Sequence, residues 1–152
     1  MTVRRSIFGL VALSVTLGLG ITVGAQMKRP YHDGAVYQLQ FIRVKPGMES
    51  TYMNYLAGPW KKMHEAGKQA GLEVSYKVIT TEAHGPADFN VILLTEVKSL
   101  SSLEMDQDKV QELMQKVVGD DQAQVNGYKE RAEIREVIGT RLAREVVLEP
   151  KM

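Results

Sequence analysis

Apolar and polar side chains alternate along residues 35–45, and this period of two predicts the first strand of the domain. One face of this strand is strongly apolar, with Tyr37, Leu39 and Phe41, while the other face is mixed. We expect the strongly apolar face to point into the domain. Pro46-Gly47 follows and ends the strand.

The period changes to three and four residues over 48–70, which predicts a helix. Gly58-Pro59 interrupts this segment, so a kink or two helical pieces are expected. Gly71 is well placed to cap the C-terminus. The apolar stripe consists of Tyr52, Tyr55, Leu56, Trp60, Met63 and Gly67.

Two further strands are predicted over 72–81 and 89–97, joined by a loop over 82–88. The second is apolar on both faces, which is typical of a central strand. The two strands with their loop indicate a long hairpin.

A second helix is expected after residue 101, where Ser101 and Glu104 have the spacing of a capping box. Gly119 can end this helix, and residues 128–136 have helix-forming composition without a clear assignment. A final strand is expected within 134–148, with Gly139 as a bulge. The apolar positions of the second helix are Met105, Val110, Leu113, Met114 and Val117.

The resulting order β-α-β-β-α-β is that of the split-βαβ, ferredoxin-like class of α+β folds. It predicts a four-stranded antiparallel sheet with both helices on one face. The other face would remain open, and an apolar open face usually marks an interface, so we expect a homodimer. The residues expected there are Ile42, Val44, Ile79 and either Val91 with Leu93 or Ile92 with Leu94.

Residues 1–25 have the pattern of a cleaved secretory signal peptide. Arg4 and Arg5 precede residues 7–25, which carry no charge and end in Val-Gly-Ala. The chain is therefore expected to be exported, periplasmic or secreted, and free of the membrane after cleavage. The alternative is a membrane anchor formed by residues 7–25. Residues 26–34 are interpreted as a flexible lead-in, and residues 35–152 as a single domain.

Composition excludes several classes of function. Of 152 residues, 44% are hydrophobic, which argues against a disordered chain. A net charge of +1 and 7% aromatic residues argue against a nucleic-acid surface. The absence of cysteine excludes disulfides, thiolate metal sites and cysteine nucleophiles. The sequence has no phosphate-binding glycine loop, dinucleotide fingerprint or metal-ligand spacing, so neither a cofactor nor a metal is expected.

Candidate chemistry is confined to a few histidine and aromatic residues. His64 lies four residues after Trp60, at the border of the apolar stripe, and could act as a general base or as a haem ligand. The alternative is a surface histidine beside a core tryptophan. His84 could close over a site from its Gly-Pro loop, or it could simply be solvated.

Aromatic residues on predicted inward faces could line a pocket for a flat aromatic or apolar ligand. Ordinary core packing is the alternative interpretation for each of them. These candidates are Tyr37, Tyr55, Trp60 and Tyr76.

The segment FIRVKPGMESTYMNYLAGPWKKMHEAG, residues 41–67, resembles the dimeric α+β-barrel superfamily, and most closely its uncharacterised exported bacterial members. The likeness covers roughly residues 35–148. It implies a homodimer and, as in several relatives, a ligand site between sheet and helices. The implied function is small-ligand binding or a cofactor-independent monooxygenase-like reaction, and the alternative is a non-catalytic envelope homodimer. We could not match the asparagine, tryptophan and histidine set of haem-degrading relatives onto this chain, which puts haem chemistry in doubt. Haem binding through His64 or His84 is the minority alternative.

Overall fold

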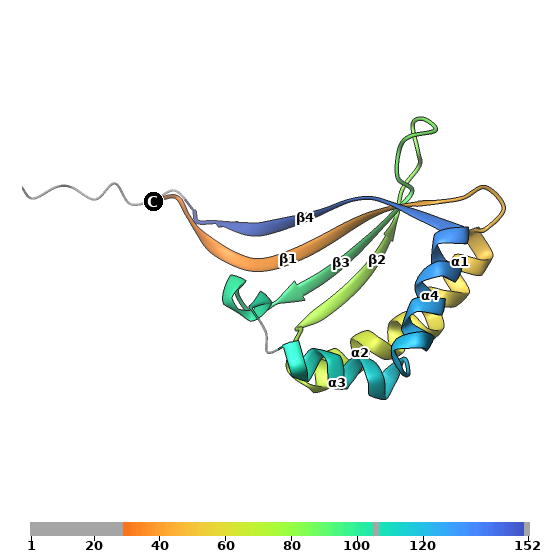
Figure 1. Ribbon diagram of the computed structural model, residues 1–152. Helices are drawn as coiled ribbons and strands as arrows, with labels where there is room; N and C mark the ends of the chain where they lie inside the picture. The colour runs from red at the N-terminus through yellow and green to blue at the C-terminus, as the bar shows by residue number, and fades with distance from the viewer. Residues whose placement is uncertain (1–28, 105–106, 151–152) are drawn as a thin grey trace, which may run out of the picture.

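Four antiparallel strands form one sheet in the computed structural model, which describes residues 29–104 and 107–150 (Figure 1). The strand order is β2-β3-β1-β4, so β1 and β3 occupy the centre. The strands are β1 (Tyr31–Val44), β2 (Ser75–Thr80), β3 (Val91–Val97) and β4 (Arg135–Leu148).

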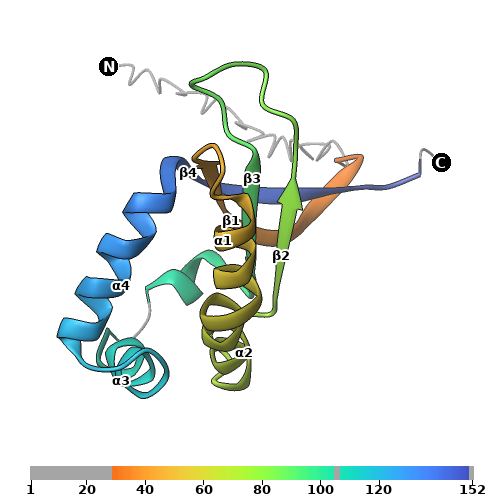
Figure 2. The ribbon, with the colours of Figure 1, turned by 90° about the vertical axis from the view of Figure 1, so that its right-hand side faces the viewer.

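The α-helices all lie on one face of this sheet (Figure 2). With the strand order, this arrangement confirms the expected ferredoxin-like α+β fold. The helices are α1 (Glu49–Tyr55), α2 (Lys61–Gln69), α3 (Gln107–Val117) and α4 (Asp121–Ile134), with a π-helix over Leu56–Trp60 and a 3₁₀-helix over Leu100–Leu103.

The expected kink at Gly58-Pro59 is a π-helical turn between α1 and α2. Pro59 has no N–H to donate, and a wider turn accommodates its ring without ending the helix. Such a turn rotates all later residues relative to a regular helix. As a result His64, expected at the border of the apolar stripe, has a side chain only 13% exposed.

The two faces of β1 are the reverse of our expectation. Ile42 and Val44, expected on the open face, are buried under α1 and pack with Tyr52. Because side chains alternate along a strand, Tyr37 and Phe41 therefore lie on the face away from the helices. The pairing of β1 with β3 places Ile92 and Leu94 on that face as well, which leaves Val91 and Leu93 on the helix side.

The hydrophobic core lies between α1, the π-helix and one end of the central strands. Tyr52 and Ile42 are fully buried, and Trp60 is 6% exposed. The cluster consists of Ile42, Val44, Tyr52, Leu56, Trp60, Val91 and Leu93.

Two boundaries, at the start of β1 and after β3, differ from the prediction. The strand β1 begins at Tyr31, within the predicted lead-in, because Tyr31 and Asp33 pair with the end of β4. The predicted capping box at Ser101 is not formed. Instead Ser99 caps the 3₁₀-helix by accepting a hydrogen bond from the Ser102 N–H. Met105 lies outside the described residues.

The structure assigns residues 128–136, which the sequence left without a clear assignment, to the end of α4 and the start of β4. Residues 128–134 belong to α4, whose N-cap Asp120 accepts a hydrogen bond from the Ala123 N–H. The final strand is confirmed, and its register with β1 shifts beside Gly139, as expected for a bulge. Gly71 and Gly119 follow α2 and α3 with positive φ, as their predicted capping roles require.

The predicted signal peptide, residues 1–25, lies outside the described residues. Among the helices that the structure does describe, none has the length and apolar character needed to cross a membrane.

Candidate ligand-binding cleft

A cleft of about 360 Å³ lies between the sheet and the helices. Its floor is the helix-facing surface of the two central strands. Here β1 contributes Gln38 and Gln40, and β3 contributes Leu93 and Thr95. Three of these four side chains are polar, although a sheet face covered by helices is normally apolar.

Two helical walls enclose the floor. The first wall, from α1 to α2, consists of Tyr55, Pro59, Trp60, Met63 and His64. The second wall belongs to the α3–α4 unit and the first residue of β4, and consists of Met114, Val118, Gln124, Arg131 and Arg135. The helix pairs contact each other across the two walls, α3 with α2 and α4 with α1. The cleft therefore lies between these helix contacts and the sheet.

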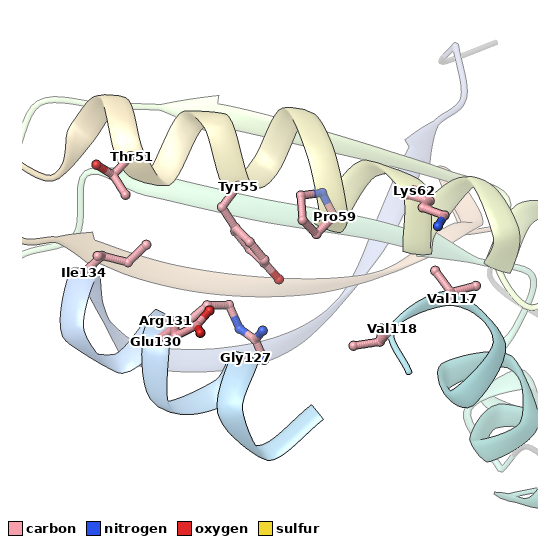
Figure 3. A pocket seen from close by; sticks show the side chains of 10 residues that line it. All are labelled: Thr51, Tyr55, Pro59, Lys62, Val117, Val118, Gly127, Glu130, Arg131 and Ile134. Carbon is pink, nitrogen blue, oxygen red and sulfur yellow. The ribbon is translucent and has the colours of Figure 1, made fainter. Parts of the chain in front are cut away.

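A second groove adjoins the cleft on its outer side (Figure 3). It shares Tyr55, Pro59, Val118 and Arg131 with the cleft. Figure 3 shows the Tyr55 ring and the Arg131 guanidinium pointing towards each other between α1 and α4, where the guanidinium carbon lies 5.3 Å from the ring centroid. This cation–π contact spans the boundary between the groove and the cleft.

His64 and Glu73 form the most enclosed polar pair of the site. The Nδ1 atom of His64 lies 2.7 Å from Oε2 of Glu73, and the glutamate side chain is only 9% exposed. When Nδ1 carries the proton, it donates to the carboxylate, and Nε2 of the neutral ring is left as an acceptor. The arrangement can therefore take up a proton at Nε2, with Glu73 stabilising the resulting imidazolium.

Aromatic rings hold this histidine in place. The Trp60 and His64 ring centroids are 4.1 Å apart, and Tyr76 contacts both rings at 5.1 and 5.2 Å. The Tyr76 hydroxyl donates to Oε1 of Glu65 at 2.5 Å. This hydrogen bond to a carboxylate is the main reason that the pKa of Tyr76 is raised to about 12. It also lowers the pKa of Glu65.

Arg135 approaches the core from the cleft. Its guanidinium carbon lies 5.7 Å from the centroid of the Tyr52 ring. Within the described part of the chain, its Nε and Nη1 atoms are buried without a hydrogen-bond partner, as is the Tyr52 hydroxyl. Burial raises the pKa of Tyr52 to about 12, and the charges of Arg135 and Arg131 oppose this rise.

The structure brings together some of the residues that the sequence pointed to. Trp60, His64 and Tyr55 line the cleft, and Tyr76 lies behind it against Trp60 and His64. Tyr37 does not belong to this group, since it lies on the opposite face of the sheet next to Glu96.

His84 also lies apart from the cleft, in the loop between β2 and β3. Its backbone N–H donates to the Asp88 carboxylate at 3.0 Å. This bond and a second one from the Phe89 N–H lower the pKa of Asp88. Hydrogen bonds within the loop therefore explain the lowered pKa of Asp88.

Other residues of the site were not found from the sequence. Glu73 is nine residues from His64, and only the turn at Gly71 brings them together. Arg131 and Arg135 lie in the segment that had no clear assignment. The sequence does contain one signal of the cleft. Gln38 and Gln40 alternate with apolar residues, and they form the polar floor.

Metal ligands do not gather in the described ranges 29–104 and 107–150. No group there of three or more histidine, aspartate or glutamate side chains could hold a metal ion.

No family model matches the sequence, and no curated protein matches it. Among solved structures, a dimeric ferredoxin-like protein from an uncultured marine organism is 12% identical, with a TM-score of 0.47, covering 80% of this chain and 93% of its own. A NIPSNAP family protein of unknown function from Agrobacterium tumefaciens is 16% identical, with a TM-score of 0.47 and coverages of 78% and 92%. HapK from Hahella chejuensis is 8% identical, with a TM-score of 0.46 and coverages of 72% and 91%.

Proposed function

We propose that this protein binds a small organic molecule in the cleft between its sheet and its helices. The observation that carries the proposal is the polar floor. Gln38 and Gln40 occupy helix-facing positions at the centre of the sheet, and both line the cleft. A domain that needed only a core would be more stable with apolar residues at these positions, because burying polar groups costs free energy.

The walls indicate what kind of molecule fits. Tyr55, Trp60 and Met63 provide apolar and aromatic contact area on one side. Met114 and Val118 provide it on the other. An apolar, preferably flat body between the walls and polar groups on the floor are typical of small-molecule sites.

The more specific form of this proposal is that His64 takes a proton from the bound molecule. Its ring lines the cleft, and Glu73 fixes it through Nδ1. In a cofactor-independent monooxygenase-like reaction the protein must take a proton from its bound substrate, and Nε2 of His64 is the candidate base. His64→Gln is then expected to preserve ligand binding and to abolish proton exchange between bound ligand and solvent.

We also propose that the chain forms a homodimer through the open sheet face. The strongly apolar side of β1 lies on this face, and the Phe41 and Phe89 rings pack there at 4.7 Å. Ile79 and Ile138 are 42% and 39% exposed. Tyr37, Leu39, Ile92 and Leu94 lie on the same face of the central strands. A second copy would cover such a patch from water. This face is also what favours the alternative function, an interaction homodimer without chemistry.

Export remains part of the proposal. Its support is the charged and then apolar pattern of residues 1–25. Purification from an envelope extract followed by intact mass measurement tests it. A chain that begins at Gln26 would confirm cleavage, and a chain that retains residues 1–25 would contradict it.

A native mass spectrum of the purified protein tests ligand binding and assembly together. We expect a dimer that carries extra mass from a retained small molecule. Val118→Phe should lose that mass, because Val118 lines the cleft and is 38% exposed, so a ring there fills the opening. Val125→Phe, at a position 48% exposed on α4, is the matched control and should keep it. If Val118→Phe retains the molecule as well as the control does, the molecule is bound elsewhere and the proposed site is wrong.

A further inference from the structure

The second wall of the cleft carries two arginines. Arg131 and Arg135 lie four residues apart at the end of α4 and the start of β4, and both line the cleft. Among the described residues that line the cleft, none is acidic. The inner surface of the cleft is therefore cationic on one side.

Two hydrogen-bond donors of Arg135 lack an acceptor in the described part of the chain, and a bound ligand would supply one. Its Nε and Nη1 atoms both carry N–H donors, which lie on different sides of the guanidinium. In the described ranges both are buried and have no hydrogen-bond partner. Leaving buried charged donors unpaired is costly, so such groups normally have an acceptor. A carboxylate carries the opposite charge, and its oxygens accept hydrogen bonds from such guanidinium donors.

Aromatic contacts fix both guanidiniums without neutralising them. Arg131 stacks on Tyr55 at 5.3 Å, and Arg135 approaches Tyr52 at 5.7 Å. These contacts limit the motion of the two cations, while their charge stays available to a third group. Both cations also act on the Tyr52 hydroxyl, since each opposes the rise of its pKa.

We propose that the cleft binds an organic carboxylate, with the carboxylate on Arg135 and Arg131 and the apolar body against Trp60 and Met63. This inference rests on the proposed function, because it names the chemical class of the ligand in the same cleft. Gln38 and Gln40 face the middle of such a molecule and can hydrogen-bond to its polar substituents.

Calorimetric titration with matched acids and amides tests this inference. The probes are benzoate, phenylacetate and cyclohexanecarboxylate, each paired with its neutral amide of nearly the same shape. We expect at least one acid to bind about tenfold or more tightly than its amide. Arg135→Gln and Arg131→Gln should each remove this preference. Arg144→Gln should keep it, because Arg144 pairs with Asp33 outside the cleft.

The outcomes separate this inference from the proposed function. Equal binding of acids and amides would overturn the anion site and leave small-molecule binding intact. Absence of binding by every acid and amide would overturn both. If inorganic phosphate binds as tightly as the best carboxylate, the apolar body contributes nothing and the assignment to an organic carboxylate is wrong.

Discussion

The imidazole of His64 and the carboxylate of Glu73 lie 2.7 Å apart, with side chains only 13% and 9% exposed. The pair joins α2 to the segment before β2, and it fixes the one histidine of the cleft. Because both groups are largely withdrawn from water, loss of either partner leaves a polar group without its hydrogen bond.

Gly67→Ala is predicted to break this pair. A Cβ atom at Gly67 would lie 2.3 Å from Oε1 of Glu73, so the carboxylate must shift, which disturbs the contact of its Oε2 atom with His64. We expect a loss of about 1–3 kcal/mol in the free energy of unfolding, measured by urea denaturation. Helix propensity alone would give a gain of about 1 kcal/mol. A gain would therefore contradict the role of the pair. Gly85→Ala, where the Cβ meets nothing within 4 Å, is the control and should be nearly neutral.

Two tyrosines should ionise well above the usual range. The pKa of Tyr76 is raised to about 12 by its hydrogen bond to Glu65, and that of Tyr52 to about 12 by burial. In a spectrophotometric titration, Glu65→Gln should bring one of these late transitions back towards 10, and Tyr76→Phe should remove it. Tyr128→Phe, at a position 68% exposed, should leave both late transitions in place.

The same shifts predict how stability depends on pH. A group whose pKa is higher in the folded state stabilises the fold fully below its unfolded pKa, here 10.0. That contribution is lost as pH rises from about 10 to about 12. Thermal unfolding of the wild type should therefore shift to lower temperature across this window, and the Tyr52→Phe/Tyr76→Phe variant should shift less. An equal shift in both proteins would contradict the assignment.

Arg135→Met should not destabilise the ligand-free protein. The substitution removes two buried donors that have no partner among the described residues, and it keeps an unbranched side chain beside Tyr52. We expect the free energy of unfolding to stay level or to rise by about 1–3 kcal/mol. A residue retained for ligand binding at a cost in stability behaves in this way. A loss of more than about 2 kcal/mol would instead assign Arg135 to the core.

Leu39→Glu should dissociate the proposed dimer. The substitution places a charge in the centre of the open face, where it would have to be desolvated on assembly. Sedimentation velocity should show a monomer with an unchanged circular dichroism spectrum. Val125→Glu adds the same charge at an exposed position of α4 and should leave the dimer intact. A wild-type monomer at micromolar concentration would refute the interface itself.

The fold could be predicted from the sequence because period and turn chemistry agree along most of the chain. The strand at β1, the helix broken at Pro59 and the caps at Gly71 and Gly119 are local features, and each is confirmed. The helix α4 was left unassigned because it lacks a clear apolar stripe. The hydrophobic pattern gave a wrong prediction for the two faces of β1. The more apolar face of β1 was assigned to the interior, whereas the structure turns Gln38 and Gln40 towards the helices.

The site was accessible to sequence analysis only in part. Trp60 and His64 share one turn of a helix, so their proximity is local. The partners of His64 and the arginines of the second wall come from segments whose contacts depend on the whole fold. The pair His64 and Glu73 needs the turn at Gly71, and Arg135 reaches Tyr52 only because β4 returns beside β1.

Fluorescence of Trp60 is the most direct measure of binding in the cleft. It is the single tryptophan of the chain, and it lines the cleft wall. Titration with cyclohexanecarboxylate, which does not absorb at the excitation wavelength, should change its emission saturably in the wild type and in Val125→Phe. Val118→Phe should abolish the change. Emission that stays constant in the wild type, or that changes equally in all three proteins, would contradict a ligand site between the sheet and the helices.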